Sequence, residues 1–135
     1  MQAARRFKFD KLIRDNLVDR LRAMGITVFD RVMDLDEYTK RLKDKLLEEA
    51  HELCSAKSPK ELTEEFADLM EVIATLALHH KISLNSIEKC RKQKKDDKGG
   101  FKNRIYVSAI QMDSNHPDLD QYLRRPEIYP ELEPV

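Results

Sequence analysis

The segment "KLLEEAHEL" at residues 45–53 repeats its apolar residues at helical spacing, and "ELTEEFADLMEV" at residues 61–72 does the same. On a helical wheel of about 100° per residue, each segment therefore carries one apolar stripe that should face a core. Both stripes contain an acid, with a second acid three residues later at the edge of the stripe. The four acids are Glu49, Glu52, Glu65 and Asp68. A buried carboxylate is costly unless a cation neutralises it.

Two explanations for these acids stay open on spacing alone. Like charges three residues apart repel by roughly 0.2–0.5 kcal/mol even when exposed. Lys45 lies four residues before Glu49 and can pair with it, whereas no cation lies between Glu61 and Glu71. A hard divalent cation bound by carboxylate oxygens, Mg²⁺ with Mn²⁺ as the alternative, accounts for both segments at once. Otherwise Glu49 and Glu65 meet Arg or Lys side chains from elsewhere in the fold.

Helix-capping signals divide the chain into elements. Asp34 begins a capping box, and Ser58 with Pro59 begins a second one, so each marks a helix start. The predicted helices are residues 15–25, 34–57, 58–80 and 83–100. Segments rich in β-branched and aromatic residues predict short strands at residues 5–9, 26–32 and 104–110. The fold class is thus mainly α, a helical bundle with short accessory β-strands.

Composition favours one domain that is completed by a partner. The chain has 135 residues, of which 37% are charged and 41% hydrophobic, which is typical of helices with thin apolar stripes. We expect a homodimer or higher homo-oligomer. The domain should span residues 1–112, and residues 113–135 form a tail that holds four of the five prolines.

Several protein classes are disfavoured by the sequence. No signal peptide and no membrane-spanning stretch is apparent, so we expect a soluble, cytoplasmic protein without membrane contact. Cys54 and Cys90 stand alone, without zinc or disulfide spacing, and should be small buried residues. No recognition-helix pattern stands out, and direct nucleic-acid binding is not expected.

Charge is unevenly distributed although the net charge is zero. Residues 48–71 hold eight acids and residues 89–104 hold eight bases. An acidic centre beside a basic flank suits a cation held next to a polyanion, while two solvated faces that attract each other explain the same counts.

Three motifs together resemble a known family. "EEAHE" followed by "EFAD" is similar to the EExxE…ExxD pattern of the all-α nucleotide pyrophosphohydrolases, the MazG-like superfamily, which includes phosphoribosyl-ATP pyrophosphohydrolase and the dimeric dUTPases. "KLIRDNLV" resembles the KLVRDKIP-like mark of one branch, and "KKDDKGGF" resembles its RGGF mark. The chain departs from the branch at Asn16, Val18 and Lys98, which stand in place of Lys, Pro and Arg.

The resemblance, over roughly residues 7–107, implies hydrolysis of a nucleoside triphosphate to the monophosphate and pyrophosphate by a Mg²⁺-dependent oligomeric bundle. We expect a non-canonical nucleotide and a house-cleaning role. The implied metal ligands are Glu49, Glu52, Glu65 and Asp68. A carboxylate takes the proton of the attacking water, and Glu48 and Glu49 are the candidates.

Basic and glycine residues are the candidate phosphate binders. The candidates are Lys11, Arg14, Asp15, Lys94, Lys95, Lys98, Gly99 and Gly100. Lysines neutralise polyphosphate and glycines allow close backbone approach. The lysines equally suit a solvated helix end, and Arg14 with Asp15 equally suits a salt bridge and a helix cap. A non-catalytic nucleotide sensor or helical scaffold is the alternative function.

Overall fold

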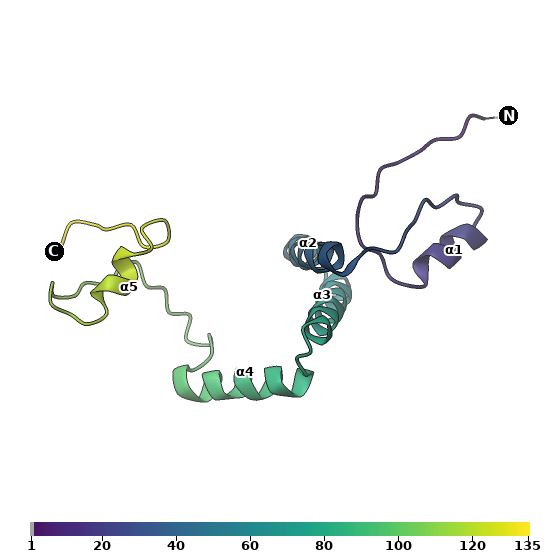
Figure 1. Ribbon diagram of the computed structural model, residues 1–135. Helices are drawn as coiled ribbons and strands as arrows, with labels where there is room; N and C mark the ends of the chain where they lie inside the picture. The colour runs from purple at the N-terminus through teal and green to yellow at the C-terminus, as the bar shows by residue number, and fades with distance from the viewer. Residues whose placement is uncertain (1) are drawn as a thin grey trace. The chain divides into compact units, whose positions relative to one another are not determined.

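The computed structural model describes residues 2–135, and the chain divides into two compact units, Met1–Lys94 and Lys95–Val135. The first unit is built on two 21-residue helices, α2 (Leu35–Ser55) and α3 (Pro59–His79), which pack against each other. Only residues 56–58 join them, so the helices run antiparallel (Figure 1). This α2–α3 hairpin carries the acids that the sequence singles out.

Capping residues set the ends of both helices. The Asp34 side chain accepts a hydrogen bond from the Glu37 amide at 2.8 Å, which begins α2. Ser58 accepts from the Glu61 amide at 3.1 Å, and Pro59 occupies the first turn of α3. These contacts confirm the predicted helix starts.

The core between α2 and α3 is small. Leu42, Val72 and Ala77 are the buried apolar side chains among residues 2–135, and Leu42 is only 1% exposed. At the open end of the hairpin, the Thr39 hydroxyl lies 2.6 Å from Nε2 of His79, which fixes the start of α2 beside the end of α3. Glu49, with 8% exposure, is the only charged residue in this core within the described part of the chain.

Three further helices are shorter or more exposed. The predicted first helix is α1 (Leu17–Ala23), followed by Gly25 at a φ of +81°, a backbone angle that glycine adopts without strain. The predicted fourth is α4 (Leu84–Lys98), which contains no buried residue. In the second unit, α5 (Leu119–Leu123) was not predicted, and the rings of Tyr122 and Tyr129 pack edge to face nearby. The expected domain boundary at residue 112 stays a prediction.

The expectation of accessory strands is wrong, although the mainly α fold class is confirmed. Residues 2–135 contain no strand. A strand needs a neighbouring backbone for its hydrogen bonds. Residues 5–9 and 26–32 meet through a side chain instead, because the Arg6 guanidinium lies 4.2 Å from the centre of the Phe29 ring. Residues 104–110 have no regular secondary structure and are exposed, with Tyr106 at 90%.

Cys54 and Cys90 are exposed rather than buried, which corrects that expectation. Within residues 2–135, none of the helices has the length and apolar character needed to cross a bilayer.

Candidate metal centre

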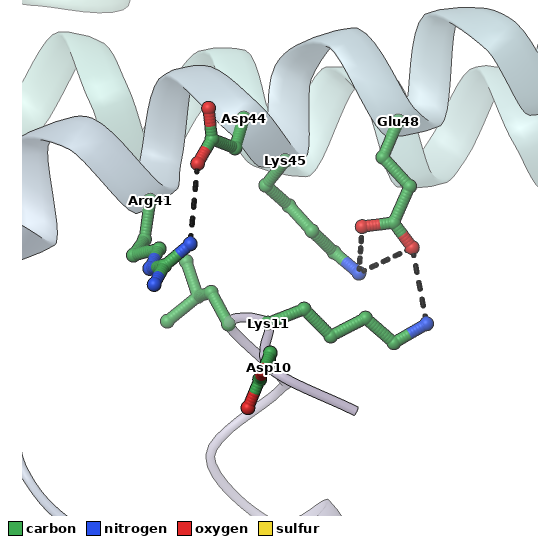
Figure 2. A pocket seen from close by; sticks show the side chains of 7 residues that line it. Asp10, Lys11, Arg41, Asp44, Lys45 and Glu48 are labelled. Atoms are coloured by element: carbon green, nitrogen blue, oxygen red, sulfur yellow. Dashed lines mark hydrogen bonds and ion pairs between the residues drawn. The ribbon is translucent and has the colours of Figure 1, made fainter. Parts of the chain in front are cut away.

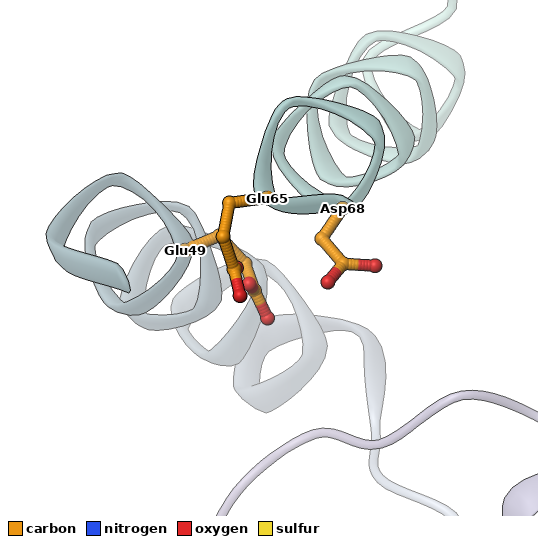
Figure 3. A group of neighbouring side chains, drawn as sticks. All are labelled: Glu49, Glu65 and Asp68. Atoms are coloured by element: carbon orange, nitrogen blue, oxygen red, sulfur yellow. The ribbon is translucent and has the colours of Figure 1, made fainter. Parts of the chain in front are cut away.

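Three carboxylates converge where α2 and α3 face each other. Glu49 extends from α2, and Glu65 and Asp68 extend from α3. One oxygen of each lies within 4.8 Å of the others, and Figure 3 shows Glu49 and Glu65 pointing into the same region. The antiparallel pairing produces this meeting, because the late part of α2 faces the early part of α3. We call these three residues the acidic trio.

Glu65 carries the least compensated charge of the trio. Burial is the first cause that raises the pKa of Glu65, and nearby acids raise it further. Those acids are Asp68, Glu49, Glu52 and Glu64. Among residues 2–135, no Lys or Arg forms an ion pair with Glu65. A cation at this point would relieve both the burial cost and the repulsion.

The other two members of the trio each have a cationic partner. Lys45 Nζ lies 3.2 Å from Oε1 of Glu49, the pairing that the sequence left open. Arg14 Nη2 donates to Oδ1 of Asp68 at 2.7 Å. Side chains therefore neutralise Glu49 and Asp68, whereas Glu65 has no cationic partner within residues 2–135. A metal ion beside Glu65 stays a prediction.

Glu48 lies beside the trio at the edge of a small cavity. The cavity measures about 30 Å³, roughly the space of one water molecule. Lys45 Nζ lies 3.4 Å from Oε1 of Glu48, and Lys11 Nζ donates to the same oxygen at 3.2 Å (Figure 2). The other lining residues are Asp10, Leu12, Arg41 and Asp44.

Glu52 is placed differently from the other predicted ligands. It is exposed, and its oxygens do not join the compact group formed by the trio. Its charge is close enough to raise the pKa of Glu65. Its role as a ligand stays a prediction.

The predicted phosphate binders fall into two groups. Lys11 and Arg14 contact the acids directly, whereas Asp15 is exposed and precedes the N-cap residue Asn16. The remaining residues lie in or just after the last two turns of α4 and are all exposed: Lys94, Lys95, Lys98, Gly99 and Gly100. Gly99 has a φ of +85°, which favours glycine at the end of this helix. Their role stays a prediction.

Sequence reasoning missed which acids Lys11 and Arg14 contact. These pairs join residues 37 and 54 positions apart, and both cations lie outside any helix. Periodicity therefore carries no signal for them. Arg41 and Lys45, which line the small cavity, were detectable in principle because their spacing of four puts them on one face of α2.

Comparison with known proteins identifies one family. A model of the family described as phosphoribosyl-ATP pyrophosphohydrolase matches residues 15–95, more than half of the chain. The matched part contains the acidic trio, Glu48 and Glu52, and it ends within α4. Searches of curated proteins and of solved structures gave no match.

Proposed function

We propose, from the premise that this chain belongs to the phosphoribosyl-ATP pyrophosphohydrolase family, that it hydrolyses a nucleoside triphosphate to the monophosphate and pyrophosphate. The observation that carries the proposal is the acidic trio, which lies inside the matched region. We expect a non-canonical nucleotide and a house-cleaning role. The family description itself makes phosphoribosyl-ATP one of the substrates to be tested.

The trio fits Mg²⁺ as its ion. Its donors are carboxylate oxygens alone, without the cysteine or histidine that favours zinc. Glu49 is buried and Glu65 is unpaired within the described residues, so a dication offsets charge that the chain itself leaves uncompensated. Mn²⁺ is the natural substitute, and Glu52 is the proposed fourth ligand. When bound, Mg²⁺ supplies polarisation of the phosphoryl oxygens and a water of lowered pKa.

The chain's own residues then bind phosphate and move the proton. Glu48 is half-exposed next to the trio, where its carboxylate can accept a proton from water, and Glu49 is the alternative acceptor. Arg14 offers two parallel N–H groups to a phosphate. The α4 lysines supply charge for the outer phosphates: Lys94, Lys95 and Lys98.

A helical scaffold or nucleotide sensor is the second candidate. The observation that favours it is the pairing of Glu49 with Lys45 and of Asp68 with Arg14, which gives two of the three acids partners without any metal. A sensor of this kind binds nucleotide and does not turn it over.

Self-association is part of the proposal. Phe66, Met70 and Ile73 follow the i, i+4, i+7 spacing of one helix face, and all three are exposed, Met70 by 67%. Leu47 on α2 is exposed by 69%. A homodimer or higher oligomer would cover such side chains. Light scattering should show a mass above the monomer, and Met70→Glu should lower it; a monomeric wild type at micromolar concentration contradicts this part.

A substrate panel tests the reaction. Phosphoribosyl-ATP and canonical and modified nucleoside triphosphates would be incubated with Mg²⁺, and the products followed by ³¹P NMR. We expect pyrophosphate as the first product, and its loss in Glu65→Gln. Orthophosphate as the first product contradicts the proposal, and nucleotide binding without any hydrolysis favours the sensor.

A further inference from the structure

A short segment before α1 contributes two cationic side chains that pair with acids of the hairpin. Lys11 donates to Glu48 on α2 at 3.2 Å, and Arg14 donates to Asp68 on α3 at 2.7 Å. We call residues 10–14 the strap. Leu12 and Ile13, between the two cations, are half-buried, so the strap lies against the hairpin rather than in solvent. One short segment therefore bridges both helices at the candidate metal centre.

We propose that Arg14 of the strap is a built-in counterion of Asp68 that a divalent cation must displace, which frees Arg14 to bind the phosphates of the nucleotide. This inference rests on the proposed metal-dependent function. It assigns Arg14 two successive partners, a carboxylate before the metal binds and a phosphate afterwards.

Charge explains why the two cations compete. Whichever oxygen of Asp68 takes the dication, the guanidinium on Oδ1 would lie only a few ångströms from it, where like charges repel. The apparent affinity of a site equals its intrinsic affinity multiplied by the fraction of molecules in which the site is open. The Arg14–Asp68 pair lowers the open fraction of the metal site. A stronger pair therefore means a weaker apparent metal affinity in the free protein.

The same pair is weak enough to exchange. Its side chains are 61% and 39% exposed, and exposed pairs contribute little. A guanidinium binds best to an anion that accepts two parallel N–H bonds, and two oxygens of a phosphate can do this as well as a carboxylate does. Lys11 differs, because its partner Glu48 lies outside the trio and also contacts Lys45. Arg14 is therefore the exchanging member, and Lys11 anchors the strap.

Calorimetric titration with Mn²⁺ alone, without nucleotide, tests the competition. Arg14→Gln should bind Mn²⁺ about two- to fivefold more tightly than the wild type, the factor that corresponds to an exposed ion pair. Arg22→Gln is the matched control, because Arg22 also donates to an exposed aspartate, Asp30, at 2.6 Å but does not touch the trio. It removes the same charge and should leave the affinity unchanged.

A second titration, with pyrophosphate, should show the opposite effect of Arg14→Gln on affinity. With Mg²⁺ present, Arg14→Gln should bind inorganic pyrophosphate more weakly than the wild type, while Arg22→Gln binds it equally. A purely structural role for Arg14 would weaken both ligands together. Equal pyrophosphate binding in Arg14→Gln and the wild type overturns the transfer of Arg14 to phosphate.

The remaining outcomes separate this inference from the proposed function. If Mn²⁺ binding is lost in Glu65→Gln but is equal or weaker in Arg14→Gln, the strap does not compete and the metal site stands. If Arg22→Gln tightens binding as much as Arg14→Gln, the effect is general charge and the strap inference is wrong. If neither the wild type nor Arg14→Gln binds Mn²⁺, the metal site and the strap inference fail together.

Discussion

The α2–α3 hairpin and helix α4 are both predicted well as helices, yet they behave differently in the structure. In the hairpin, apolar stripes on two helices face each other and bury Leu42 and Val72 together with the charged Glu49. Helix α4 has no buried residue and ends in the basic stretch around Lys95 and Lys98. The hairpin thus has its partners within the chain. Among residues 2–135, the charged side chains of α4 form an ion pair only within the helix, between Arg91 and Glu88. The basic end of α4 would therefore suit an anionic ligand from outside.

The largest expected effect contrasts the buried core of the hairpin with the exposed helix α4. Leu42→Ala should lower the free energy of unfolding by about 2–5 kcal/mol, because the side chain is 1% exposed and its removal leaves a cavity. Ile87→Ala in α4 is the control, since Ile87 is already 37% exposed and should change stability much less. Urea denaturation followed by circular dichroism measures both. Equal losses would mean that α4 also packs against something.

The next largest effect is expected on turnover, from replacing the buried Glu49 of the hairpin. Glu49→Ala should lower turnover by more than about a hundredfold, because loss of even an outer-shell partner of a metal costs up to that factor. Glu64→Gln, on an exposed position one residue before Glu65, should leave kcat nearly unchanged. Initial rates at saturating Mg²⁺ provide the measurement. A comparable loss in both variants would point to general charge rather than to a site.

Substitutions in helix α4 should weaken substrate binding rather than slow turnover. Lys98→Ala should raise KM by about tenfold with little change in kcat, because a phosphate contact already present with bound substrate affects KM first. Lys89→Ala is matched to it, as nine residues put the two lysines on opposite faces of the helix. A fall in kcat with unchanged KM would refute a simple phosphate contact.

Local signals made the helices predictable, and distant contacts account for what was missed. The starts of α2 and α3 follow from Asp34 and Ser58, whose caps act within three residues. The helical wheel placed Glu49 and Glu65 in the apolar stripes of their helices. The three-residue connection between α2 and α3 then brings the two stripes together.

Strands and strap contacts depend on partners that periodicity does not reveal. The segment at residues 26–32 has strand-like composition, but no other backbone segment within residues 2–135 pairs with it in a ladder. The bond from Arg14 to Asp68 spans 54 positions and follows from the folded path of the chain alone.

The smallest expected effect uses pH to test the unpaired acid. The pKa of Glu65 is raised above its ordinary value of 4.5 in the folded state, first by burial and then by neighbouring acids. The folded chain thus holds this proton more tightly than the unfolded chain does. Stability from Glu65 is therefore present at low pH and is lost as pH rises from 4.5 through the raised pKa.

Glu65→Gln removes this pH-dependent penalty, so it should unfold at a higher temperature than the wild type at neutral pH. The difference should narrow as the pH falls toward 4.5, where the wild-type carboxyl becomes protonated. Added Mn²⁺ should reverse the order at neutral pH, because a bound ion stabilises only the chain that keeps the carboxylate. Thermal melts at several pH values, with and without Mn²⁺, measure this. A Glu65→Gln variant that is less stable than the metal-free wild type at neutral pH would mean that Glu65 makes a favourable contact in the folded chain.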